Sequence, residues 1–89
     1  WGLMWRRGMQ ENSALLIDPC SSIHTFMMRF AIDVVFLDKE NTVTKVAECI
    51  KPYRVAFAPR CKRVLEMPCG AAARAGLAVG DLLSFQTVG

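Results

Sequence analysis

The chain has 89 residues, which is enough for one domain and too few for two. Hydrophobic residues make up 53% and charged residues 21%, a balance that excludes a disordered chain. The net charge of +3 is a mild excess, and no apolar run reaches the ~18 residues of a membrane helix. We therefore expect one soluble domain over residues 1–89, with no membrane span.

The first part of the chain predicts short strands. Residues 1–12 mix apolar and basic side chains without a regular period, which predicts an irregular or briefly helical entry segment. Strands are expected over 14–17 and over 23–30. The strongest strand prediction covers 32–37, because β-branched and aromatic residues dominate it.

A hairpin is expected next, with a turn at 38–41 and a second strand over 42–50. Two further strands are predicted over 54–58 and 61–67, and Pro59 separates them because proline cannot donate to a ladder. These strands extend the same antiparallel pattern.

The only good helix-forming run is 71–75, followed by Gly76 where a left-handed cap is expected. A closing strand is predicted over 82–85. No helix is long enough to connect parallel strands. The fold class is therefore all-β and mainly antiparallel, a small β-barrel or sandwich with one short helix near the C-terminus.

Four cysteines stand at positions 20, 49, 61 and 69, and none forms a Cys-x-x-Cys pair. No secretory segment precedes them, so we expect reduced, mostly buried thiols. Reduced thiols favour a cytoplasmic location. An upstream export signal stays open, since the sequence starts at Trp1 rather than Met.

A basic run, Arg60-Cys61-Lys62-Arg63, flanks an apolar pair. It has two interpretations: a solvated strand edge, or a patch that binds phosphate. No nucleic-acid module signature accompanies the run, so the first interpretation is preferred and no nucleic-acid partner is expected.

Asp33 lies inside the strongest predicted strand, where an isolated carboxylate costs several kcal/mol. His24 and Arg29 are its nearest cationic candidates in sequence. They differ by five positions, so a regular pleat places them on opposite faces of one strand, and a bulge would be needed to bring them together. The alternative is that Asp33 is a buried tie that fixes loop geometry, much like a cap.

Glu66 is likewise a carboxylate within an apolar predicted strand. The simpler explanation is that this strand is half exposed and has one polar face. Cys20 and His24 could ligate zinc or copper, or could act as nucleophile and base with Asp33 as the orienting group. Two ligands are too few for a closed metal site, so no metal and no cofactor are expected.

Residues 23–38 resemble the central signature of domain-of-unknown-function family 192. Three further elements are similar to the family pattern: Gly2-Leu3-Met4, the run 64–70, and Gly76-Leu77 with Gly80-Asp81. The resemblance implies a compact β fold with a short helix near the C-terminus. It implies no established activity and does not fix the compartment. It also implies that His24, Arg29, Asp33 and Glu66 match polar points of the motif.

The chain departs from the family pattern in three ways. Ala31 stands where the family usually has proline, and Cys69 where it usually has alanine. The family usually has a strand before the Gly-Leu-Met element, and we expect that strand to be missing here. Its absence would leave an open sheet edge and favour a homodimer.

Three functions compete. The preferred one is a binding module whose ligand-binding candidates are His24, Arg29, Asp33, Glu66 and Cys20, with Arg29 holding a small anionic ligand or a peptide end. The second is an enzyme that uses acid–base chemistry or Cys20 as nucleophile, with its catalytic residues unknown. The third is an interaction domain that binds a protein partner through an open sheet edge.

Overall fold

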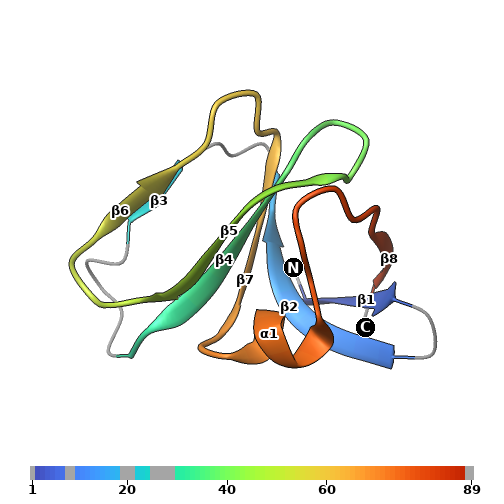
Figure 1. Cartoon of the computed structure of the whole chain (residues 1–89), viewed down its shortest axis with the longest axis horizontal. Coiled ribbons are helices and arrows are strands. Elements are labelled where there is room, and N and C mark those ends of the chain that lie inside the picture. Colours follow the sequence, from blue (N-terminus) through green and yellow to red (C-terminus); the bar gives the residue numbers. More distant parts are fainter. Residues whose placement is uncertain (1, 8–9, 19–21, 25–29, 88–89) are drawn as a thin grey trace.

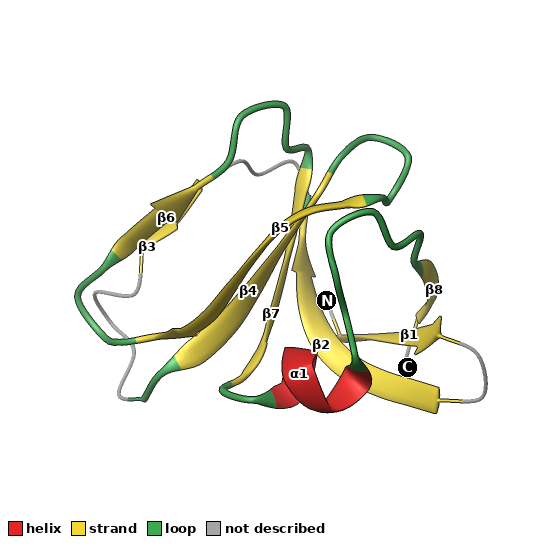
Figure 2. Cartoon of the chain, in the orientation of Figure 1, coloured by secondary structure: helices red, strands yellow, loops and turns green. Residues whose placement is uncertain are grey.

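The computed structural model describes residues 2–7, 10–18, 22–24 and 30–87; its side chains are described over 14–18, at Ser22 and over 30–85. This part of the chain forms strands and one short helix (Figures 1 and 2). The elements in chain order are β1 (Gly2–Arg7), β2 (Gln10–Ile17), β3 (Ser22–His24), β4 (Ile32–Leu37), β5 (Val43–Ile50), β6 (Val55–Phe57), β7 (Arg63–Pro68), α1 (Ala71–Ala75) and β8 (Ser84–Thr87). No helix among the described residues is long and apolar enough to cross a membrane.

The strands form a six-stranded sheet in the order β5-β4-β7-β2-β1-β8 and a two-stranded sheet of β3 and β6. Every pair of neighbouring strands is antiparallel. The outer strands of the large sheet approach each other at one end. There Thr42 bridges Leu82, and the Val43 N–H donates to the Asp81 carbonyl at 2.8 Å. The large sheet therefore curls toward a barrel, and the predicted all-β antiparallel fold is confirmed.

Strand β4 divides the core into two clusters, because all six of its residues are buried. Val35 and Leu37 pack with residues of α1 and with Leu83. Val34 and Phe36 face the other way, toward Ala56 of β6. Figure 1 shows the same division. Strands β3 and β6 lie to the left of β4, and α1 lies at the bottom of the view, beside the C-terminal end of β7. A charged residue in β4 is therefore buried on whichever face it points to.

Local chemistry explains the best-predicted elements. The hairpin turn between β4 and β5 is fixed by Asp38, whose Oδ1 accepts hydrogen bonds from the N–H groups of Glu40 and Thr42. Helix α1 ends at Gly76, which adopts φ 69°. The Gly76 N–H donates to the Ala73 carbonyl and the Leu77 N–H to the Ala72 carbonyl, the pairing of a Schellman cap. The predicted hairpin, helix and cap are confirmed.

Two predictions about the chain path are wrong. The described residues of the segment 1–12 are neither irregular nor helical, since β1 and the start of β2 form an antiparallel pair there. The basic run at 60–63 does not border a sheet edge, because β7 lies between β4 and β2. Arg63 instead donates to Asp18 at 2.8 Å and to the Asn41 side chain at 2.6 Å. That arginine ties the start of β7 to two neighbouring loops.

The bounds of two other strands differ from those predicted. Of the predicted strand 23–30, the described part holds only the short β3, and residues 25–29 lie outside the described residues. The closing strand begins at Ser84 rather than at residue 82. Strand β1 pairs with both β2 and β8. The edges of the large sheet, as far as it is described, are therefore β5 and β8 rather than the first strand.

Candidate functional site

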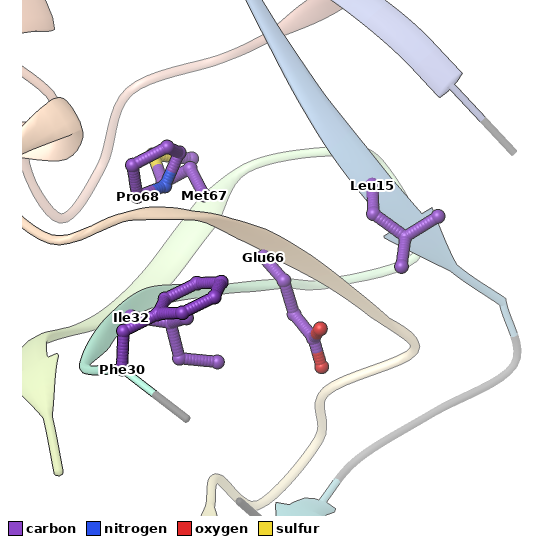
Figure 3. A pocket seen from close by; sticks show the side chains of 6 residues that line it. All are labelled: Leu15, Phe30, Ile32, Glu66, Met67 and Pro68. Atoms are coloured by element: carbon purple, nitrogen blue, oxygen red, sulfur yellow. The ribbon is translucent and has the colours of Figure 1, made fainter. Parts of the chain in front are cut away.

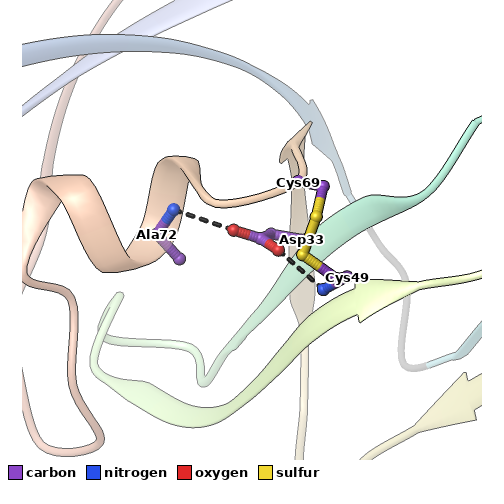
Figure 4. The surroundings of a disulfide bond; sticks show 4 residues. All are labelled: Asp33, Cys49, Cys69 and Ala72. Carbon is purple, nitrogen blue, oxygen red and sulfur yellow. Dashed lines mark hydrogen bonds between the residues drawn. A yellow bond between two sulfur atoms is a disulfide. The ribbon is translucent and has the colours of Figure 1, made fainter.

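Asp33 is completely buried, and backbone groups from two distant segments satisfy it. The Cys49 N–H donates to Oδ1 at 2.7 Å and the Ala72 N–H donates to Oδ2 at 2.9 Å (Figure 4). Within the described part of the chain, no cationic side chain pairs with this carboxylate. Two charge-assisted hydrogen bonds thus replace the ion pair that burial would otherwise require.

The two donors explain why a carboxylate is needed at this position. The register between β4 and β5 shifts between Ile32 and Val34, and Cys49 has a φ of 49° beside that irregularity. A bulge of this kind leaves an N–H without a ladder partner. Ala72 lies in the first turn of α1, whose cap residue Gly70 has no side chain to accept a hydrogen bond. Asp33 therefore caps a bulge and a helix at once, as the buried-tie interpretation proposed.

A disulfide joins Cys49 to Cys69 directly beside Asp33 (Figure 4). The expectation of reduced, buried thiols is wrong for this pair, because the two cysteines are oxidised and both residues are exposed. They are 20 residues apart in sequence, and the bulge and the junction between β7 and α1 bring their Cα atoms to 4.7 Å. Cys61 matches the expectation, since it is buried and is not part of a disulfide.

Glu66 lies on the opposite face of the sheet from Asp33. In the β4–β7 register Glu66 faces Val34, whereas Asp33 faces Met67. Residues opposite each other in a ladder share a face, and neighbours along a strand point to opposite faces. The two carboxylates that the sequence singled out therefore belong to separate sites.

The half-buried Glu66 lines a cavity of about 190 Å³ whose other walls are apolar. The walls come from three strands and the bend that precedes β4 (Figure 3): Leu15, Phe30, Ile32, Met67 and Pro68. Leu15 is 43% exposed and Phe30 is 63% exposed, so the cavity opens to solvent. It combines one carboxylate with an accessible apolar surface.

Three of the predicted site residues cannot be placed in this cavity. Cys20 and Arg29 lie outside the described residues, and so does the side chain of His24. The backbone of His24 pairs with Val55 in the ladder between β3 and β6. The hypotheses that depend on these side chains remain predictions.

A larger hollow of about 520 Å³ lies between the hairpin turn and the loop before β7. Its lining mixes both signs of charge: Asp38, Lys39, Glu40, Thr44, Arg60 and Lys62. Asp38 is engaged by the turn, where its Oδ1 accepts two backbone N–H groups. The phosphate interpretation of the basic run stays a prediction.

The model of the DUF192 family (Uncharacterized ACR, COG1430) matches residues 1–85. The chain belongs to this family. The UPF0127 protein PYRAB11210 of Pyrococcus abyssi (strain GE5 / Orsay) is 38% identical over 69 residues, or 75% of this chain. That alignment covers 57% of the length of the Pyrococcus protein. The resemblance inferred from the central signature is confirmed.

Two crystal structures share the fold of this DUF192 chain. A Novosphingobium aromaticivorans DSM 12444 protein of unknown function gives a TM-score of 0.77 at 16% identity, covering 93% of this chain and 83% of that one. A Sinorhizobium meliloti 1021 protein, described as a proposed transcription regulator, gives 0.77 at 14% identity, covering 94% and 92%. At these identities the likeness establishes the fold alone. The family has no characterised function.

Sequence reasoning missed the cysteine pair. Cysteine motifs are recognised by their spacing in sequence, and the 20 residues that separate Cys49 from Cys69 match no motif. One signal was available: Cys69 stands where the family pattern usually has alanine. Pairing it with Cys49 required the positions of β5 and β7 on either side of β4.

Proposed function

We propose that this domain is a small binding module and that its ligand enters the cavity beside Glu66. The observation that carries the proposal is the juxtaposition of one carboxylate with the exposed apolar side chains of Leu15 and Phe30. Ligand sites characteristically combine apolar walls with a few fixed polar groups. This cavity is built on strands of the central sheet, which hold such groups in place.

The size and charge of the cavity narrow the class of ligand. A volume of about 190 Å³ is below the ~300 Å³ of common small-molecule sites, so it suits one side chain or a compact ring. The charged side chain among the described residues of the wall is the Glu66 carboxylate, a group that binds an amine or another N–H donor. The proposed ligand is therefore a peptide end or small molecule that joins an apolar group to an amine.

The test is a titration of the full chain with phenethylamine, in which the NMR shifts of the backbone amides report binding. A compact probe of nine heavy atoms binds at about millimolar affinity when each atom contributes ~0.4 kcal/mol. We expect saturating shifts around the cavity and at least about fivefold weaker binding in Glu66→Gln, because one charge-assisted hydrogen bond is lost. The matched control is Glu48→Gln, which removes an exposed glutamate from β5.

The oppositely charged probe 3-phenylpropionate tests the original anion hypothesis. Stronger binding of this carboxylate, abolished by Arg29→Ala in a folded variant, would replace the amine with an anionic ligand held by Arg29. If neither probe produces saturating shifts, or if Glu48→Gln weakens binding as much as Glu66→Gln, the cavity is not the binding site.

A further inference from the structure

A cluster of three potential metal ligands lies on the other face of the sheet. A carboxylate oxygen of Asp33 and the Sγ atoms of Cys49 and Cys69 all lie within 4.8 Å of one another. We propose that the reduced chain binds one zinc-class divalent cation through these three residues, and that the disulfide is the oxidised, metal-free form of the same site. This proposal is independent of the cavity beside Glu66.

The distances suit tetrahedral coordination. With Zn–S bonds of ~2.3 Å and a Zn–O bond of ~2.0 Å, tetrahedral angles separate the ligand atoms by roughly 3.5–3.8 Å. The cluster already lies within 4.8 Å, so cleavage of the disulfide needs to move the two sulfur atoms apart only by side-chain rotation. The backbones that carry them are fixed by the hydrogen bonds of Asp33 to Cys49 and to Ala72 at the start of α1.

The electrostatics also favour a cation. Asp33 is fully buried, and its donors within the described chain are two neutral N–H groups. Each of its oxygens keeps a second lone pair in the direction that the backbone donors leave free. Reduction places two thiols beside this negative charge, and a divalent cation would neutralise the carboxylate and both thiolates together.

The donor set selects the class of metal. Two thiolates with one carboxylate suit zinc, whereas calcium and magnesium prefer oxygen ligands alone. Three protein ligands leave a fourth position for water, as in zinc sites that are open to solvent. Both cysteines are exposed, so the open position faces the surface.

The redox step balances with a dithiol as the partner. The dithiol gives two electrons and two protons to the Cys49–Cys69 bond, which becomes two thiols while the reductant becomes a disulfide. Cation binding then releases the two thiol protons to solvent. After loss of the cation the two thiolates regain protons from solvent. Transfer of two electrons and two protons from the thiols to a disulfide oxidant, which becomes a dithiol, restores the bond.

The experiment uses Co²⁺ as a spectroscopic probe for zinc on the full chain, reduced with a phosphine. To remove competing ligands, the background variant carries Cys20→Ser, His24→Gln and Cys61→Ala, which leaves only the proposed pair of thiols. We expect one equivalent of Co²⁺ to give a thiolate-to-cobalt charge-transfer band with the visible bands of tetrahedral cobalt. Zn²⁺ should displace it, and Cys49→Ser, Cys69→Ser or reoxidation should abolish the band.

Two results would overturn the proposal. One is a folded, reduced background variant without a thiolate-to-cobalt band. The other is a wild-type band that survives Cys49→Ser and disappears with Cys20→Ser, which would place the metal at Cys20. Asp33→Asn should weaken binding at least about tenfold if it folds, as loss of a charged ligand requires. If it does not fold, X-ray absorption of the zinc-loaded background variant decides, with two sulfur and two lighter ligands expected and any other sulfur count refuting the site.

Discussion

The role of Asp33 as a double cap leads to a sharp stability prediction for Asp33→Asn. Both oxygens accept an N–H, from Cys49 and from Ala72, so an asparagine in either orientation turns its NH₂ group toward one backbone donor. A buried hydrogen bond to a charged group contributes about 1.5–3 kcal/mol, and the variant loses one such bond and weakens the other. We expect the free energy of unfolding to fall by about 3 kcal/mol, and by more in Asp33→Ala, which leaves both donors unsatisfied.

The assay is urea unfolding of the oxidised protein, with circular dichroism as the readout. The matched control is Asp38→Asn, since Asp38 also accepts two backbone N–H groups, but through Oδ1 alone and at a partly exposed turn. Asparagine can keep that oxygen in place, so a loss below about 1 kcal/mol is expected there. Equal losses in the two variants, or a loss below about 1 kcal/mol at Asp33, would refute the double-cap argument.

Three further predictions concern stability. Cys69→Ser opens a loop of 20 residues and should lower the free energy of unfolding by about 3 kcal/mol, as measured by urea unfolding against a reduced wild-type control that should match the variant. Gly70→Ala and Gly80→Ala should each cost about 1–2 kcal/mol in thermal unfolding, because both positions have φ above 89°. Near-equal losses would show that backbone strain dominates, since a Cβ at residue 70 meets only the movable end of Arg74 and one at residue 80 meets nothing. Phe36→Ala should cost about 3–5 kcal/mol in the same assay, and a loss below about 1 kcal/mol would contradict its complete burial.

The local elements of this fold could be predicted from sequence because neighbouring residues determine them. Strand β4 is formed by a run of β-branched and aromatic residues and has the predicted bounds. The helix and its glycine cap lie within six consecutive residues. Strand β1 was missed because its residues show no alternating pattern, and its pairing with β2 and β8 defines it instead.

The site was harder to predict because long-range contacts define it. The burial of Asp33 could be inferred from its apolar neighbours, and the resemblance to a cap was a correct hypothesis. Its two donors are 16 and 39 residues away, and no local pattern identifies them. The separation of Asp33 from Glu66 follows from register, and register is fixed only when β4 and β7 pair.

This separation makes the two proposals testable one at a time. Glu66 shares a face with Val34 and Asp33 shares the other face with Met67, so the two carboxylates lie on opposite faces of the sheet. The cavity wall comes nearest to the cysteine cluster at Met67 and Pro68. If metal binding leaves those two wall residues in place, the two sites behave additively to within about 0.5 kcal/mol. Loading the reduced chain with Zn²⁺ should therefore change phenethylamine affinity by less than about threefold, as measured by the same NMR titration. A larger change would mean that reduction or metal binding repacks β4 itself. Reduced chain without metal, titrated in parallel, identifies which of the two steps is responsible.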